Sequence, residues 1–292
     1  MNVLLYVAVV LIWGTTWLAI AVQTAYTPPL NAVFWRFATA VAVLWLLLAV
    51  LRRLKVLGRQ DQLWCAVQGA CVFCLNFVCL YSAVKYINSG LLAVIFSLSV
   101  WFNALNSRLF FGHALTRRFA VSALLGLCGM VALFWPDMLA GDGEHGLWRG
   151  MAFAVAGTYL FSLGNMVSLR HQRRGLNVFH TNAWAMLYGT VWLALLVFLS
   201  GQLLAPPSDG AFWLATFHVA VPGTVVGFAV YFLLVGRIGA AKAAYSMLLT
   251  PLVALAVSTV WEGHRWHAAG VLGVALILCG NYLMFSRPPA RL

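Results

Sequence analysis

The polar side chains that could bind a ligand are few and lie inside long apolar runs. Asn76, Asn103, Asn106 and Asn165 are each flanked by hydrophobic residues. A carboxamide in such a run either binds a neighbouring helix or faces an aqueous cavity. Helix–helix contact is the more frequent role, so we expect packing for any one of these amides and keep ligand binding as the alternative.

Three basic residues have unusual positions. Arg36 lies within an apolar run, where a charge at the centre of a membrane helix would cost about 2.5–3.5 kcal/mol. It is only a few residues from the start of that run, so we expect it to extend to the interface or bind a backbone carbonyl rather than a substrate. His113 and His264 could titrate near neutral pH. Both lie at the ends of apolar runs, which favours a structural role over proton coupling.

Catalytic and metal-binding patterns do not accompany these residues. The six acids fall near the ends of the apolar runs, which leaves no paired carboxylates for general acid–base chemistry. The seven histidines show no HExxH or comparable ligand spacing. Serines and threonines are plentiful but lack an evident His–Asp partnership. The sequence therefore predicts no enzyme, no metal site and no cofactor.

Composition places the chain in a membrane. Of its 292 residues 63% are hydrophobic and only 8% are charged, whereas soluble domains have about 25% charged residues. A net charge of +12 would suggest nucleic acid in a soluble domain. In a membrane protein the same excess follows from basic cytoplasmic loops, so no nucleic-acid partner is needed.

The elements that must position the polar residues are predicted to be transmembrane helices. A bilayer core about 30 Å thick requires about 20 helical residues, and β-barrel strands would show short alternating runs instead. The expected fold class is therefore all-α and polytopic, with ten helices. Their approximate ranges are 3–22, 31–51, 62–84, 89–111, 117–135, 148–169, 180–200, 211–235, 239–261 and 267–286.

The distribution of basic residues predicts the orientation. Fourteen of the 18 Lys and Arg residues lie in alternate connections and in the C-terminal tail. Only Lys85, Arg149 and Arg265 occupy the other connections, and Arg36 lies within a helix. Because cytoplasmic loops retain Lys and Arg, both termini are expected to be cytoplasmic.

An internal repeat appears when the chain is shifted by 151 residues. Gly112-His113 then matches Gly263-His264, and Leu127-Cys128-Gly129 matches Leu278-Cys279-Gly280 in the same register. Each repeat would contain five helices, over residues 1–140 and 141–292. An odd number of helices makes the two repeats cross the bilayer in opposite senses. Inverted repeats are typical of transporters whose substrate site lies near the midplane between the halves.

Several motifs in order along the chain resemble the EamA-type branch of the drug/metabolite transporter superfamily. They are Trp13-Gly14-Thr15-Thr16-Trp17, Phe34-Trp35-Arg36-Phe37, Gly223-Thr224, Gly239-Ala240-Ala241-Lys242-Ala243 and Leu249-Thr250-Pro251-Leu252. The resemblance covers essentially the whole chain. It implies an exporter with two inverted five-helix repeats, most similar to bacterial aromatic amino-acid exporters.

The chain also departs from this family. The family usually has Gly-Glu where Gly112-His113 and Gly263-His264 stand, and Val100 replaces a proline that would match Pro251. The related small multidrug pumps use a glutamate in their first helix. The range 3–22 has no acid, which argues against proton-coupled export of cationic drugs.

The resemblance also implies which helices surround a central cavity, and with them the candidate site. We expect substrate contacts from deep aromatic and amide residues, although packing is an equally good explanation for any one aromatic. These candidates are Trp13, Trp17, Asn76, Tyr81, Trp101, Tyr159, Asn165, Tyr231 and Tyr245. Pro222, Gly223 and Pro251 are candidate hinges, because proline removes a backbone hydrogen bond.

These features predict an inner-membrane transporter that exports aromatic or neutral amino acids, or similar small metabolites, by alternating access. The alternatives are a nucleotide-sugar or drug carrier of the same superfamily, or a membrane protein that does not transport. A nucleotide sugar should require several deep cations, and Arg36 is the one candidate. The expected partners are a small-molecule substrate and the lipid bilayer, and a monomer is compatible with this architecture.

Overall fold

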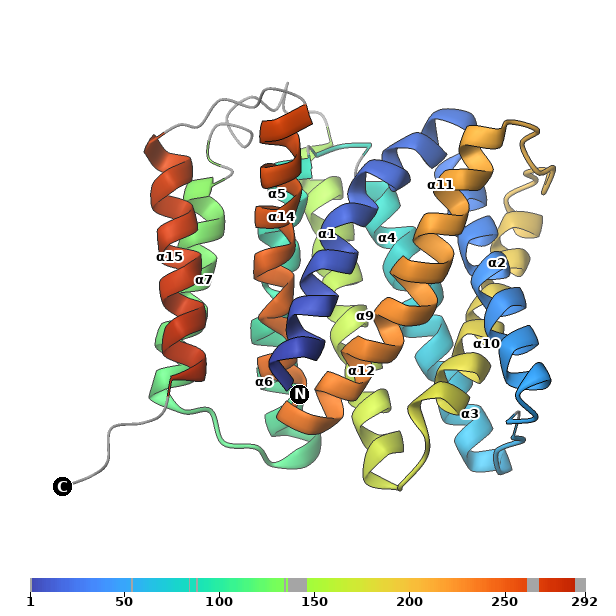
Figure 1. The fold of residues 1–292 in the computed structure, drawn as a ribbon, viewed down its shortest axis with the longest axis horizontal. Helices are drawn as coiled ribbons and strands as arrows, with labels where there is room; N and C mark the ends of the chain where they lie inside the picture. Colours follow the sequence, from blue (N-terminus) through green and yellow to red (C-terminus); the bar gives the residue numbers. More distant parts are fainter. Residues whose placement is uncertain are drawn as a thin grey trace.

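A computed structural model describes residues 2–53, 55–83, 85–87, 89–133, 135, 146–261 and 268–286, and all regular structure within these ranges is helical (Figure 1). The first half contains α1 (Asn2–Tyr26), α2 (Pro29–Val50), α3 (Arg59–Gln68), η1 (Gly69–Leu75), α4 (Asn76–Ala83), α5 (Ser89–Ser97), α6 (Ser99–Phe111) and α7 (Arg117–Leu133). The second half contains α9 (Leu147–Arg173), α10 (Val178–Leu199), α11 (Gly210–Ala220), η2 (Val221–Val226), α12 (Gly227–Ile238), α13 (Ala240–Ala244), α14 (Ser246–Trp261) and α15 (Ala268–Phe285).

Seven helical stretches within the described ranges are long and apolar enough to cross a membrane. They are Pro29–Val50, Arg59–Ala83, Leu91–Phe111, Leu147–Arg173, Val178–Leu199, Gly210–Ile238 and Ala268–Phe285. Each coincides with a predicted span. Helices α1, α7 and α13–α14 cover the other three predicted ranges, so the count of ten spans stays a prediction. The chain has the architecture of a polytopic membrane protein.

Two of the predicted helices are interrupted. The range 89–111 divides at Leu98 into α5 and α6, and 239–261 divides at Tyr245 into α13 and α14. Beside each break a serine hydroxyl donates to a carbonyl three residues earlier, from Ser97 to Val94 and from Ser246 to Ala243. Such local side-chain bonds compete with the helical pattern, which apolar periodicity alone does not reveal.

The bounds of the helices recur after a shift of 151 residues. The series α3, η1 and α4 begins at residues 59, 69 and 76, and the series α11, η2 and α12 begins at residues 210, 221 and 227. Helix α7 begins at residue 117 and α15 at residue 268. Both halves thus have a π-helical segment at the corresponding place, a detail that the shift of the sequence did not predict.

The two halves interlock. Helix α1 packs on α14 and α12, and α9 makes the corresponding contacts with α6 and α4. Helix α2 packs on α10, and α7 lies beside α15 at one edge of the molecule (Figure 1). A Cβ atom on Gly129 of α7 would lie 2.7 Å from the Gly273 carbonyl oxygen of α15. These glycines therefore allow the close approach of α7 and α15.

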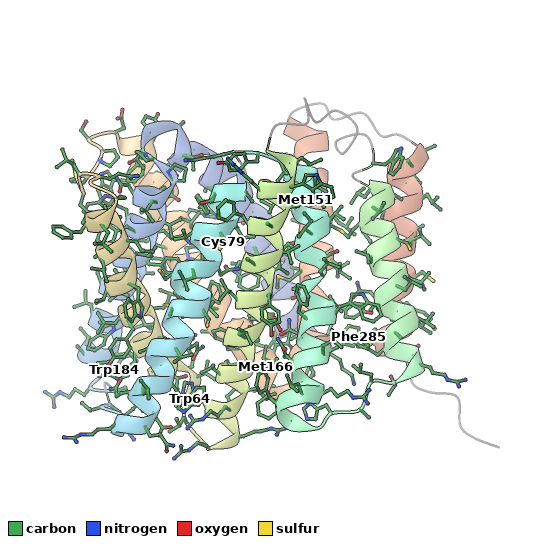
Figure 2. All side chains as sticks on the ribbon, turned by 180° about the vertical axis from the view of Figure 1, so that it is seen from behind. Trp64, Cys79, Met151, Met166, Trp184 and Phe285 are labelled. Atoms are coloured by element: carbon green, nitrogen blue, oxygen red, sulfur yellow. The ribbon has the colours of Figure 1, made fainter. Side chains whose placement is uncertain are left out.

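One end of the molecule carries many basic side chains. Helix α1 begins and α15 ends at this end, the lower one in Figure 1. Nitrogen-tipped side chains gather at the same end in Figure 2, near Trp64 and Trp184. Asp61 forms salt bridges of 3.2 Å with both Arg170 and Arg174 there, which joins the two halves. The assignment of this end to the cytoplasm stays a prediction.

Candidate functional site

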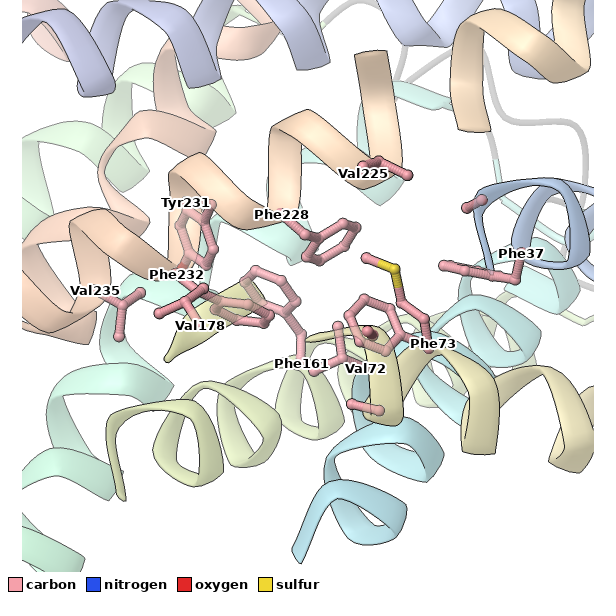
Figure 3. Packing of buried hydrophobic residues seen from close by; sticks show 14 of the residues in the cluster. Phe37, Val72, Phe73, Phe161, Val178, Val225, Phe228, Tyr231, Phe232 and Val235 are labelled. Carbon is pink, nitrogen blue, oxygen red and sulfur yellow. The ribbon is translucent and has the colours of Figure 1, made fainter. Parts of the chain in front are cut away.

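An aromatic cluster occupies the centre of the bundle. Helix α12 projects Phe228, Tyr231 and Phe232 towards α9 and the η1 segment (Figure 3). The Tyr231 ring stacks on Phe161 with a centroid separation of 5.6 Å, and Phe228 meets Phe73 edge to face at 5.0 Å. These residues are almost completely buried. The helices of both halves therefore meet around aromatic side chains.

Trp13 joins this cluster from α1. Its ring lies 5.1 Å from that of Tyr231 and 5.0 Å from that of Phe228. Its Nε1 donates a 2.8 Å hydrogen bond to the Gly223 carbonyl in η2. A Cβ on Gly227 would lie 2.6 Å from this Nε1, so a glycine is needed where the indole crosses the helix. Trp13 thus links α1 to η2 and α12.

Amides form the polar edge of the cluster. Asn165 in α9 donates from Nδ2 to Asn103 Oδ1 at 3.0 Å and to the Tyr231 hydroxyl at 3.1 Å. Its Oδ1 is buried and lacks a hydrogen-bond partner within the described part of the chain. Asn103 also donates to the Ser99 carbonyl at 2.8 Å. A buried acceptor without a partner costs free energy unless a ligand or water satisfies it.

The other amides join helices. Asn76 in α4 donates to the Gly157 carbonyl in α9 at 2.8 Å, and Asn106 in α6 donates to Ser162 in α9 at 2.9 Å. Both are buried. The expected role of helix–helix contact therefore fits Asn76 and Asn106, whereas the Oδ1 of Asn165 has no partner among the described residues.

The remaining predicted residues lie in other places. Tyr245 is fully buried beside Phe119 at 6.3 Å, and the Trp101 ring contacts the same phenyl ring at 5.9 Å. Tyr159 is 40% exposed and packs on Phe102, away from the central cluster. The Trp17 side chain lies outside the described residues. The structure thus brings together Trp13, Asn165 and Tyr231, but not all of the predicted set.

The three candidate hinges differ in their surroundings. Pro222 and Gly223 lie in the π-helical η2, and Gly223 supplies the carbonyl that binds Trp13. Single π-helical turns within α-helices occur frequently at functional sites. Pro251 lies inside α14. The structure therefore associates Pro222 and Gly223, but not Pro251, with an irregular segment beside the aromatic cluster.

Arg36 occupies a position that the sequence did not predict. Its side chain is buried, and its Nε donates to Thr224 Oγ1 in η2 at 2.9 Å. The expectation that it would extend to the interface or bind a carbonyl was wrong, because its guanidinium is buried and binds the hydroxyl of Thr224 on a neighbouring helix. The guanidinium lies over the Phe77 ring, 4.7 Å from its centroid. Its place within an apolar run was the available signal.

No group of three or more His, Cys, Asp or Glu side chains that could hold a metal occurs in the described ranges. Bundled apolar helices around a buried aromatic and amide cluster are the architecture of a polytopic membrane protein, and transporters have this architecture. Comparisons with known proteins specify the class. The model of the EamA-like transporter family matches residues 1–135 and 148–286. The chain belongs to this family.

Relatives resemble the chain over nearly its full length. It is 25% identical to the "Uncharacterized transporter YoaV" of Bacillus subtilis over 96% of each chain. The "Uncharacterized inner membrane transporter YedA" of Escherichia coli is 27% identical, over 96% of this chain and 92% of YedA. The "Probable amino-acid metabolite efflux pump" of Salmonella typhimurium is 23% identical, over 94% and 91%. A crystal structure shares the fold, with a TM-score of 0.79, 21% identity and coverage of 97% and 96%.

Proposed function

We propose that this protein exports aromatic or neutral amino acids, or similar small metabolites, across the inner membrane by alternating access. The central support is the cluster of Trp13, Asn165 and Tyr231, in which a buried amide oxygen stays available among aromatic rings. Aromatic walls with a few polar groups suit a small substrate that has an apolar side chain. A relative named as a probable amino-acid metabolite efflux pump agrees with this substrate class.

The same proposal includes two inverted five-helix repeats. The recurrence of helix bounds after 151 residues supports it, as do the reciprocal contacts of α1 with α14 and of α9 with α6. Rocking of one half against the other would expose the cluster alternately to each side. The irregular η2, which contains Pro222 and Gly223, is the proposed hinge. The relative YedA, named as an inner-membrane transporter, supports the location.

Counterflow in proteoliposomes tests the function. The purified protein is reconstituted, loaded with one unlabelled amino acid at a time, and supplied with the labelled form outside. Labelled aromatic or neutral amino acids should accumulate transiently above protein-free vesicles, with and without a pH gradient. A nucleotide sugar and a lipophilic cation serve as comparison substrates. Flux of either comparison substrate without flux of any amino acid would contradict the proposal.

A further inference from the structure

The buried guanidinium of Arg36 lies deep within the bundle. Arg36 is seven residues after Pro29, the first residue of α2, which places its backbone about 10 Å along the helix. Its side-chain partner Thr224 is at the midpoint of the apolar stretch Gly210–Ile238. Only 3% of the Arg36 surface is exposed. The charge therefore lies near the depth of the central cluster and not at a membrane interface.

This charge has no acidic partner within the described ranges. Asp61 pairs with Arg170 and Arg174 at the basic end, and Asp209 is exposed at the start of α11. Arg36 is held instead by the Thr224 hydroxyl, which itself donates to the Val219 carbonyl at 2.7 Å. A buried cation without a counter-ion loses several kcal/mol of hydration. Cation–π contacts with the rings of Phe77 and Phe37 compensate for part of this lost hydration.

Two hydrogen-bond donors at this place are unused. Arg36 Nη1 and the Tyr81 hydroxyl are buried without a hydrogen-bond partner among the described residues. The guanidinium lies within reach of the Tyr81 oxygen. A phenol that accepts from a guanidinium still has its own hydrogen to donate. A guanidinium edge and a phenol together suit the two oxygens of a carboxylate. A carboxylate would also supply the missing negative charge.

The aromatic cluster continues from Arg36. The Phe77 ring under the guanidinium is 6.5 Å from that of Phe228, which in turn contacts Trp13. We propose that Arg36, with Tyr81, binds the carboxylate of the transported substrate, whose apolar part lies against these rings. This inference rests on the proposed function and specifies it as transport of monocarboxylates. One buried cation matches a single negative charge rather than a diphosphate.

A set of matched ligands and variants tests this site. The ligands are L-phenylalanine, 3-phenylpropionate, which keeps the carboxylate without the amine, and L-phenylalaninamide, which has no carboxylate. Binding is measured from the thermal stabilisation of the detergent-solubilised protein, and transport from counterflow. The wild type should bind both acids at least tenfold more tightly than the amide. R36Q should bind both acids at least tenfold more weakly and leave the amide unchanged.

The control variant removes another arginine with a similar local contact. Arg170 lies 4.7 Å above the Trp64 ring, as Arg36 lies 4.7 Å above Phe77, but it pairs with an acid at the basic end. Asp61 keeps Arg174 as a partner in R170Q. R170Q should retain the wild-type preference for the acids. Equal losses of acid affinity in R36Q and R170Q would overturn the inference, because both would then reflect a general effect of charge.

The outcomes separate this inference from the proposed function. Phenylalanine counterflow by R36Q with an unchanged KM would overturn the carboxylate site and leave the transport function intact. Stabilisation by 3-phenylpropionate that R36Q abolishes, without flux of any amino acid, would support the site and contradict the function. If R36Q does not fold, R36K decides: a preference for the acids reduced at least threefold supports the site, because lysine lacks the planar donor pair. An unchanged preference overturns it.

Discussion

Asn76 and Asn165 show two uses of a buried carboxamide in this fold. Asn76 donates to a backbone carbonyl of α9. The Asn165 Nδ2 donates to both Asn103 Oδ1 and the Tyr231 hydroxyl. The Asn165 Oδ1 has no partner in the described part of the chain. A bond to a neighbouring backbone stabilises helix packing, while an unused acceptor beside aromatic rings can serve a ligand.

The packing role of Asn76 predicts a loss of stability. Replacement of Asn76 with Ala should lower the free energy of unfolding by about 1 kcal/mol, because the Gly157 carbonyl loses its donor. Thermal unfolding in detergent measures the change. The matched control is Gln202→Ala in the exposed connection between α10 and α11. Equal stability of the two variants would contradict the helix–helix contact.

The Trp13 hydrogen bond predicts a loss of transport. Trp13→Phe keeps an aromatic ring near Tyr231 but removes the Nε1 donor from the Gly223 carbonyl. The initial rate of amino-acid counterflow should decrease several-fold, because η2 is then less firmly joined to α1. Trp192→Phe, in a side chain 43% exposed on α10, should transport like the wild type. If the two variants were indistinguishable, Trp13 would have no part in transport.

The sequence predicted some of these residues but not their partners. Polarity within apolar runs identified Asn165, and depth identified Trp13 and Tyr231. Depth also selected Tyr159, which is 40% exposed, because depth along a helix does not specify its inward face. Arg36 was assigned to the interface or to a backbone carbonyl, because its bond to Thr224 joins residues 188 positions apart. Such contacts depend on helix packing and are not encoded in local spacing.

At the scale of elements, two π-helical segments distinguish this bundle. Segment η1 packs against α10, and η2 lies between α1 and α2. A Cβ on Gly69 would lie 2.3 Å from the Ala185 carbonyl oxygen, which is backbone and cannot turn away. The corresponding η2 holds Thr224 against Arg36. These segments determine how closely the neighbouring helices pack. The length of the apolar runs predicted the helices, but not their π-helical turns.

Gly69 should therefore tolerate no side chain. Gly69→Ala should destabilise the protein by about 1–3 kcal/mol, because η1 and α10 must separate. Gly58→Ala is a suitable control, since a Cβ at Gly58 would meet nothing within 4 Å and its φ of −62° suits alanine. Thermal unfolding and the yield of monodisperse protein measure both. A Gly69→Ala protein as stable as Gly58→Ala would contradict the close packing.

The two halves of the molecule are held together by helix packing and by salt bridges. Helices of the first half pack on helices of the second. Helix α1 contacts α12 as α9 contacts α4, and α2 contacts α11 as α10 contacts α3. The salt bridges of Asp61 join the halves at the basic end. Composition predicted a polytopic protein, and the positions of the basic residues predict that the basic end is cytoplasmic. The interlocking could not be predicted, because hydropathy orders helices along the chain and not around an axis.

The proposed topology predicts which surface residues a membrane-impermeant maleimide can reach. Arg53→Cys lies after α2 at the basic end, and Gln202→Cys lies after α10 at the opposite end. With intact spheroplasts the reagent should label Gln202→Cys and should label Arg53→Cys only after lysis. The unsubstituted protein reports any labelling of its own cysteines. The reverse pattern would place the termini outside the cell.

Counterflow of L-phenylalanine by the wild type and by Asn165→Leu tests directly whether the central cluster takes part in transport. Asn165→Leu removes the amide from Tyr231 and Asn103 while keeping a side chain of similar volume. Both proteins are reconstituted at equal density after thermal unfolding confirms that they are folded. The wild type should show saturable flux, and Asn165→Leu should decrease this flux at least tenfold. Equal flux in the two proteins, or no wild-type flux above protein-free vesicles, would contradict this prediction.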